Sequence, residues 1–204
     1  MSEKILSQYE KKYTVEDYLK FEQRSANKHE FVDGKVLSTA DSNRTHSLIV
    51  TNTTIAIGSR VRGQNCEVYA GDMRVQLNPK RFGYPNLVVV NGKPLFSSSQ
   101  SDILLNPTVV FEVFSKTTTS NDKTEKLDSY LEMDSIRECL FVKADEMRVE
   151  HYAKQTIKQW VYRIYNIRED VISLDSINCK ISIAEIYSAK TARVCRTWAT
   201  RWWR

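Results

Sequence analysis

The segment NPTVVFEVFSKTT, residues 106–118, has the pattern of a strand with two apolar faces. Alternate side chains of a strand point to opposite faces of its sheet. Val110 and Phe114 therefore share one face, and Phe111 and Val113 share the other. A strand that is apolar on both faces is typical of the centre of a sheet that is covered on both sides. The segment predicts such a central strand.

Glu112 lies in the middle of this apolar strand. A buried carboxylate is costly unless it is paired or binds a cation. Two interpretations are open: a salt bridge to a lysine or arginine, or a role as a metal ligand or acid–base group. A second polar residue favours the latter, because Asn86 directly precedes another apolar run, LVVV at residues 87–90. Taken alone, Asn86 could also be a simple strand cap.

Patterns elsewhere predict the elements around these two strands. Thr14 and Asp17 form a helix-capping signal, Asp33-Gly34 is a hairpin signal, and Gly63 is a natural helix stop. The predicted helices cover residues 15–23, 44–62 and 121–134, with a helical turn at 182–187; the hairpin covers 29–39, the other strands cover 67–69, 73–77, 138–143, 147–154 and 158–165, and a polar loop covers 93–102. This order predicts one α+β domain with a central mixed sheet flanked by helices.

The composition, with 41% hydrophobic and 27% charged residues in a chain of 204, is ordinary for a globular domain. The chain has no apolar run of the ~20 residues that a membrane span needs. Its first residues also lack the apolar core of a signal peptide. We therefore expect a cytoplasmic protein without a membrane partner. The four cysteines are far apart, which predicts buried thiols and neither a zinc site nor a disulfide framework: Cys66, Cys139, Cys179 and Cys195.

The net charge of +5 comes from the C-terminal end of the chain. Five basic residues follow Glu185, the last acidic residue, and the rest of the chain has 25 basic and 25 acidic residues. Charge alone therefore gives no argument for nucleic-acid binding by the body of the protein. Residues 189–204 are predicted to be a basic, tryptophan-rich tail outside a domain that covers residues 1–188. Two interpretations of the tail are open: contact with nucleic acid or a membrane surface, or an extension foreign to the domain.

Common catalytic motifs are absent from the sequence. It has no HExxH, GxSxG, P-loop or GxGxxG pattern, and its three histidines have no metal-ligand spacing. Acidic and amide side chains near strand ends, with lysines close by, remain as candidates. They lie within six segments that follow one another in order: RxxxxHEFVDG at 24–34, RTHSLIV at 44–50, AGDMRV at 70–75, GYPNLVVV at 83–90, NPTVVFEVFSKTT at 106–118 and DKTEKLDSY at 122–130.

Together these segments resemble the Uma family of restriction endonucleases, which belongs to the PD-(D/E)XK nuclease superfamily. The resemblance covers about residues 14–187. It implies a restriction-endonuclease-like core, DNA as the substrate, and Mg²⁺ or Mn²⁺ as the cofactor. Because cutting both strands of a duplex needs two active sites or two encounters, a homodimer is also compatible with it.

The resemblance also implies roles for individual residues. Glu30 matches an acidic residue at the end of the first helix that helps to hold the metal. Asn86 stands in place of the Asp of the "PD" pair, and Glu112 matches the acidic residue of the "(D/E)XK" element. Phe114 replaces the lysine expected two residues later, and Lys126 in the following helix is the implied catalytic lysine. Glu30, Asn86 and Glu112 are thus the implied metal ligands.

Further residues are supporting candidates. Asp122 precedes Lys126 in a DxxxK pattern, and Lys116 is a second candidate lysine on the strand face of Glu112. Asp72 and His46 are each a support for the site or an ordinary turn or helix-start residue. Tyr130 lies one helical turn after Lys126 and packs against it in the simplest interpretation.

Asn86 decides between two classes of function. A hard cation such as Mg²⁺ prefers oxygen ligands, and an amide oxygen is such a ligand without a negative charge. The chain is then an endonuclease that tolerates Asn86, or a non-catalytic nucleic-acid-binding or protein-interaction module on the same fold. A substitution at this position in the protein studied is a third explanation of Asn86.

Overall fold

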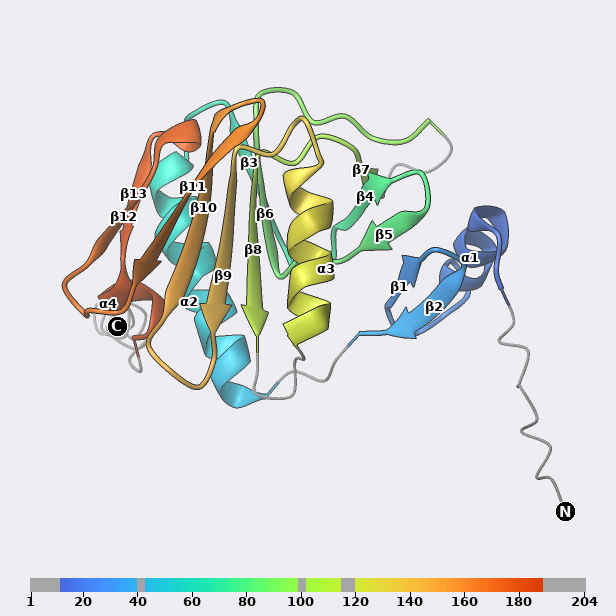
Figure 1. Ribbon diagram of the computed structural model, residues 1–204, viewed down its shortest axis with the longest axis horizontal. Coiled ribbons are helices and arrows are strands. Elements are labelled where there is room, and N and C mark those ends of the chain that lie inside the picture. The colour runs from blue at the N-terminus through green and yellow to red at the C-terminus, as the bar shows by residue number, and fades with distance from the viewer. Residues whose placement is uncertain (1–11, 40–42, 99–101, 115–119, 189–204) are drawn as a thin grey trace, which may run out of the picture.

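Two β-sheets and a β-hairpin form the strand layers of the protein (Figure 1). The structure is a computed structural model that describes residues 12–39, 43–98, 102–114 and 120–188. Helices cover both faces of the larger sheet, and the smaller sheet lies beside it with the N-terminal helix (Figure 1). The predicted α+β architecture, a central mixed sheet flanked by helices, is confirmed.

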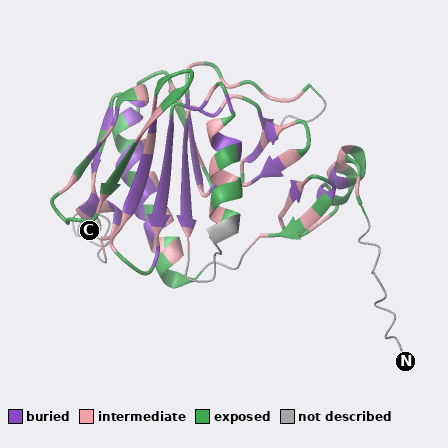
Figure 2. Cartoon of the chain, viewed as in Figure 1, coloured by how far each residue is buried: buried purple, intermediate pink, exposed green. Residues whose placement is uncertain are grey.

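The central sheet has β8 in its interior, as the apolar pattern predicts. Its strands follow the order β11-β10-β9-β8-β6-β3. Their bounds are β3 Cys66–Ala70, β6 Leu87–Asn91, β8 Val109–Phe114, β9 Glu138–Lys143, β10 Val149–Thr156 and β11 Gln159–Tyr165. Strand β8 pairs with β9 in parallel and with β6 antiparallel, so the sheet is mixed. Figure 2 shows the inner strands of this sheet as its most buried part.

The two faces of the central sheet have different covers. Helix α2 (Arg44–Val61) lies on one face, where Phe111 and Val113 of β8 belong to the core. That core also includes residues of β12 (Val171–Leu174), the 3-10 turn η1 (Asp175–Ile177), β13 (Cys179–Ser182) and α4 (Ile183–Ile186). Helix α3 (Ser120–Leu131) lies on the other face, where Val110 belongs to the core. Glu112 shares the strand face of Val110 and therefore points toward α3.

The smaller sheet has the order β2-β1-β5-β4-β7. Its strands are β1 His29–Val32, β2 Lys35–Ser38, β4 Arg74–Asn78, β5 Arg81–Gly83 and β7 Ile103–Leu104. Helix α1 (Val15–Glu22) packs on it through Tyr18, whose ring stacks on Phe31 with centroids 5.0 Å apart. The helix begins at the predicted capping box, in which Thr14 and Asp17 exchange hydrogen bonds.

The β1–β2 hairpin corrects the implied position of Glu30. Glu30 lies in β1 and not at the end of the first helix, because α1 ends at Glu22. The Glu22 carboxylate accepts a hydrogen bond from the backbone N–H of His29 at 2.9 Å, where the strand starts. Asp33 (φ 49°) and Gly34 (φ 94°) are both left-handed, as a tight two-residue hairpin turn requires.

The remaining differences from the sequence patterns are short strands. Strands β5, β7, β12 and β13 have two to four residues each and were not predicted. Lys116, Cys195 and the predicted tail lie outside the described residues. Cys139 and Cys179 are buried as expected, and Cys66 is partly buried.

Candidate active site

A cavity of about 330 Å³ lies where the end of β8, the start of β6 and the first turns of α3 meet the β1–β2 hairpin. Six of the residues that the sequence singles out line it: Glu30, His46, Asn86, Glu112, Asp122 and Lys126. They come from five segments that are far apart in the sequence, and the fold brings them to one point. This cavity is the candidate active site.

Glu112 is the most deeply buried acid of the cavity, with 4% of its surface exposed. One carboxylate oxygen, Oε1, accepts hydrogen bonds from the Tyr130 hydroxyl at 2.5 Å and from Lys126 Nζ at 3.2 Å. Burial raises the pKa of Glu112, and the nearby Glu30 carboxylate raises it further, while Lys126 and Tyr130 partly offset the shift. Glu112 thus forms a salt bridge, which was the first of its two interpretations. Its partner, Lys126, is also the lysine that the family resemblance implies as catalytic.

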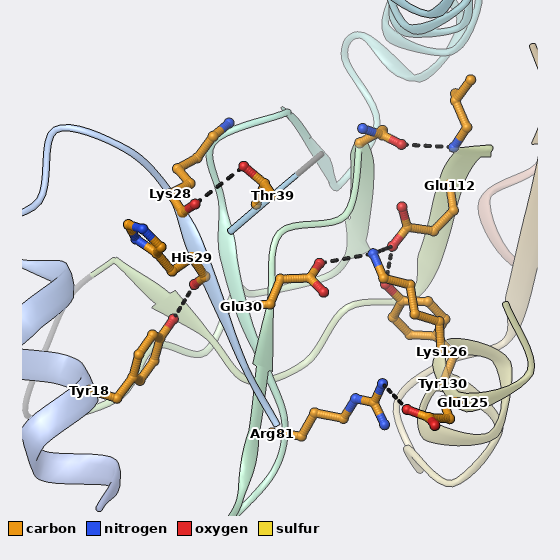
Figure 3. Close-up of polar contacts among 12 residues, drawn as sticks. Tyr18, Lys28, His29, Glu30, Thr39, Arg81, Glu112, Glu125, Lys126 and Tyr130 are labelled. Carbon is orange, nitrogen blue, oxygen red and sulfur yellow. Dashed lines mark hydrogen bonds and ion pairs between the residues drawn. The ribbon is translucent and has the colours of Figure 1, made fainter. Parts of the chain in front are cut away.

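Lys126 connects the two sheets of the molecule (Figure 3). Its Nζ atom lies 2.8 Å from Glu30 Oε1 of the smaller sheet and 3.2 Å from Glu112 Oε1 of the central sheet. Burial alone would lower the pKa of Lys126, but the carboxylates of Glu112 and Glu30 raise it above its ordinary value. Lys126 is therefore a charged ammonium that lies between two carboxylates.

Asn86 ties the start of β6 to the end of β8. Its side-chain Oδ1 accepts a hydrogen bond from the backbone N–H of Val113 at 2.7 Å, and its backbone oxygen accepts one from Gly71 at 3.0 Å. The Asn86 amide thus acts as the strand cap that its position alone suggested, and it also lines the cavity. An aspartate in the same position would keep this bond with one oxygen and present a second, charged oxygen.

His46 lies beside Asn86 in the first turn of α2. Burial lowers the pKa of His46, and a hydrogen bond with the Asn86 side chain partly offsets this shift. The Nδ1 atom of His46 is buried and has no hydrogen-bond partner within the described part of the chain. The neutral imidazole is therefore favoured.

The other supporting candidates separate into near and far residues. Tyr130 contacts Glu112 from behind the cavity, so it orients this carboxylate and does more than pack against Lys126. Asp122 lines the cavity from the first turn of α3. Asp72 does not line the cavity; its side chain is 90% exposed and forms an ion pair with Lys28 at 2.8 Å. Its position is that of an ordinary loop acid.

Several lining residues were not found from the sequence. Arg81 lies opposite Val32 in the register of β1 and β5, which turns it toward the cavity beside Glu30. Its Nη2 atom is 3.9 Å from Glu125 Oε2 of α3. Leu37, opposite Glu30 on β2, is 45% exposed at the cavity. The sequence signal for Arg81 was weak because β5 has three residues and no alternating pattern.

A wider hollow of about 540 Å³ lies at the opposite end of β6 and β8. Its buried acid, Glu138, accepts hydrogen bonds from the backbone and hydroxyl of Ser176 and lies 3.1 Å from His151 Nε2. Its carboxylate oxygens are thus occupied by structural contacts. Among the described residues around this hollow, no lysine lies between two acids. The smaller cavity therefore stays the candidate active site.

The chain is similar to known proteins in sequence and in fold. Residues 15–184 match the family model of Uma2, described as "putative restriction endonuclease". The chain belongs to the Uma2 family. Two uncharacterized proteins of Synechocystis sp. are similar: sll1609 is 26% identical over 149 residues, which are 72% of this chain and 84% of that protein. The second, slr1290, is 25% identical over 177 residues, which are 86% and 92% of the two chains.

A solved structure shares the fold of this Uma2 protein. The crystal structure of a "putative nuclease belonging to DUF820" from Anabaena variabilis matches with a TM-score of 0.71 at 17% identity, over 86% of this chain and 97% of that one. The central mixed sheet with its flanking helices is thus a restriction-endonuclease-like core, as the resemblance implied.

Two further findings concern the described residues alone. None of their helices is both long and apolar enough to cross a membrane. Nowhere among them do three or more His, Cys, Asp or Glu side chains form a group that could hold a metal ion. The candidate site instead combines two carboxylates with an amide and a lysine.

Proposed function

We propose that this Uma2 protein is a metal-dependent endonuclease that hydrolyses phosphodiester bonds of DNA, with Mg²⁺ or Mn²⁺ as its cofactor. The observation that carries the proposal is the convergence of Glu30, Asn86, Glu112 and Lys126 on one cavity. Membership of a family of restriction endonucleases and the matching fold support the same class of reaction.

The side chains fit a hard divalent cation in the chemistry of their donor atoms. Such ions take oxygen ligands, and Glu30, Glu112 and Asn86 would supply two carboxylates and one amide oxygen. The position of Lys126 Nζ between both carboxylates supports the view that this space accepts positive charge. A bound divalent ion supplies a polarised phosphoryl oxygen and a water of lowered pKa.

The charges of the site support activity in spite of Asn86. The two carboxylates, the Lys126 ammonium, one divalent ion and one phosphodiester would sum to zero charge, while Asp122, Glu125 and Arg81, which also line the cavity, add a net charge of −1. An aspartate at position 86 would add a negative charge that holds the cation more tightly. We therefore expect Asn86 to weaken binding of the cation and not to abolish it.

The residues of the chain have distinct tasks in this proposal. Glu30 and Glu112 would hold the cation, and Tyr130 fixes the orientation of Glu112 through its hydroxyl. Lys126 keeps its proton, because both carboxylates raise its pKa, and its ammonium can donate to the charge that develops on the phosphate. Lys126 then exchanges part of its contact with the carboxylates for contact with the phosphate.

Plasmid DNA incubated with Mg²⁺ or Mn²⁺ tests this function. Asn86→Asp should nick DNA faster than the unaltered chain, because the added carboxylate strengthens cation binding. Glu112→Gln keeps the shape of the side chain and should abolish nicking in both backgrounds. If Asn86→Asp yields no cleavage that Glu112→Gln removes, the hydrolytic function is wrong.

A second candidate function is a non-catalytic nucleic-acid-binding or protein-interaction module. The observation in its favour is that Lys126 already pairs with both carboxylates, and that Asn86 adds no charge. Salt-dependent DNA binding without turnover would support it.

We also propose a cytoplasmic location, where DNA is accessible, and a homodimer as one way to cut both strands.

A further inference from the structure

A row of aromatic rings leads from the cavity to the outer edge of the central sheet. Phe114 of β8 lines the cavity, and its ring centroid lies 4.9 Å from that of Phe141 of β9. Phe141 lies 5.8 Å from Tyr152 of β10, and Tyr152 lies 4.8 Å from Tyr162 of β11. These four rings, one from each of four neighbouring strands, are called the aromatic row. They lie on the sheet face of Glu112.

The outer end of the aromatic row is open to solvent. Phe141 is 1% exposed, but Tyr162 is 46% exposed and Tyr152 is partly exposed. Trp160, two residues before Tyr162 and on the same face of β11, extends the row along the strand. Figure 1 shows α3 beside β8, whereas β10 and β11 lie farther from it, on the other side of β9. Exposed aromatic rings on a sheet face that no helix among the described residues covers are a surface on which flat ligands can stack.

The charged groups beside the row are mainly cations. Lys154 Nζ lies 5.5 Å from the ring centroid of Trp160. Lys123 and Arg148 contact the carboxylate of Glu150 at 2.6 and 3.2 Å. Glu150 is 5% exposed and its charge is compensated, whereas the side chains of both partners are 30% exposed. The surface therefore presents positive charge next to the rings.

The aromatic row is continuous with the candidate active site. Lys123 follows Asp122, which lines the cavity, and its Nζ lies 5.8 Å from the ring of Phe141. Phe114 belongs to both the cavity and the row. A chain that leaves the cavity past the start of α3 would meet Lys123 first and the rings of Tyr152 and Tyr162 next.

We propose that the aromatic row and its cations bind a single-stranded segment of nucleic acid. Unpaired bases have free faces that stack on aromatic rings without regard to sequence, and cations follow their phosphates. Paired bases of a duplex already stack on each other and offer no such face. The inference deepens the proposed function and rests on it in one respect: the substrate is DNA with a single-stranded segment next to the point of cleavage.

Binding in EDTA tests this inference separately from hydrolysis. Fluorescence anisotropy of a labelled single-stranded oligonucleotide would be measured with the full chain and with Tyr162→Ala. Loss of one stacking ring should weaken binding about tenfold, while Tyr162→Phe, which keeps the ring, should bind as the unaltered chain does. Ile157→Ala is the matched control, because Ile157 is an exposed apolar residue, 85% exposed, outside the aromatic row.

The outcomes are distinct. Equal binding by Tyr162→Ala and the unaltered chain would overturn the inference, as would an equal loss of affinity for a duplex of the same sequence. Because β11 is an edge strand, a second copy of the chain is the competing occupant. A dimer that becomes monomeric in Tyr162→Ala, with unchanged binding of the oligonucleotide, would assign the surface to that contact. If the oligonucleotide binds as expected but Asn86→Asp does not cleave plasmid DNA, the hydrolytic function alone is overturned.

Discussion

At the scale of single residues, the hydroxyl of Tyr130 holds the central acid of the candidate site. It donates to Glu112 Oε1 at 2.5 Å, and both side chains are almost fully buried. A hydrogen bond to a buried charged group contributes more than an ordinary one, and loss of one partner leaves the other without compensation. Tyr130 is thus a positioning residue for the site and a contributor to stability.

Tyr130→Phe should lower the free energy of unfolding by about 2 kcal/mol. Because the ring and its packing are kept, the change in the free energy of unfolding reports on the hydroxyl alone. Denaturant unfolding monitored by circular dichroism measures the change. Tyr69→Phe is the control: its hydroxyl bonds to Glu67 at an exposed position, so a change within about 0.5 kcal/mol is expected. Equal changes in the two variants would contradict a special role of the Tyr130–Glu112 contact.

At the scale of elements, the glycines of α2 and of its C-terminal loop differ in backbone conformation alone. Gly58 lies within α2, and Gly63 follows the helix with φ at +84°. A Cβ atom added at either position would meet nothing within 4 Å. Steric room is therefore the same at both positions, and any difference between them comes from the backbone.

Gly58→Ala should raise the free energy of unfolding by about 0.5–1 kcal/mol, because alanine is the better helix residue. Gly63→Ala should lower it by about 1 kcal/mol, because the left-handed conformation disfavours a side chain. Denaturation midpoints of the two variants measure the contrast. The same sign for both would show that the conformation at Gly63 is not needed to end the helix.

The long elements could be predicted from the sequence, and the short ones could not. The capping box at Thr14, the hairpin at Asp33-Gly34 and the apolar strand around Glu112 each rest on local signals. Strand β7 has two residues, Ile103–Leu104, and it forms through parallel pairing with β4 rather than through a pattern of its own. Such pairing depends on the tertiary fold and leaves no periodic trace.

At the scale of the whole molecule, the candidate site exists because two sheets meet. Glu30 comes from the smaller sheet, Glu112 from the central sheet, and Lys126 from the helix between them. The apolar strand pattern indicated Glu112, and the family resemblance indicated Glu30 and Lys126. The hairpin predicted at 29–39 placed Glu30 correctly in a strand, whereas the resemblance implied a position at the end of a helix. Arg81 was missed because only the register of β1 and β5 directs it toward the cavity. Distances across sheets are a property of the fold, not of local pattern.

The predicted domain, residues 1–188, can be tested at this scale. A chain that ends at residue 188 should unfold at the same temperature as the full chain, because Tyr187 is the last residue that packs against the described core. Differential scanning calorimetry measures both. Its DNA affinity should be lower at low salt, since five of the basic residues are removed. A lower unfolding temperature would show that residues 189–204 belong to the domain.

The hydrogen bond of Asn86 bears on how this site can change during evolution. Its Oδ1 atom is already held by the backbone of Val113, so an aspartate fits the same place with the same shape. Codons for asparagine and aspartate differ in their first base alone. One point mutation thus separates this chain from a site with three acids. A lineage can lose or regain the charge in a single generation, with the fold preserved throughout.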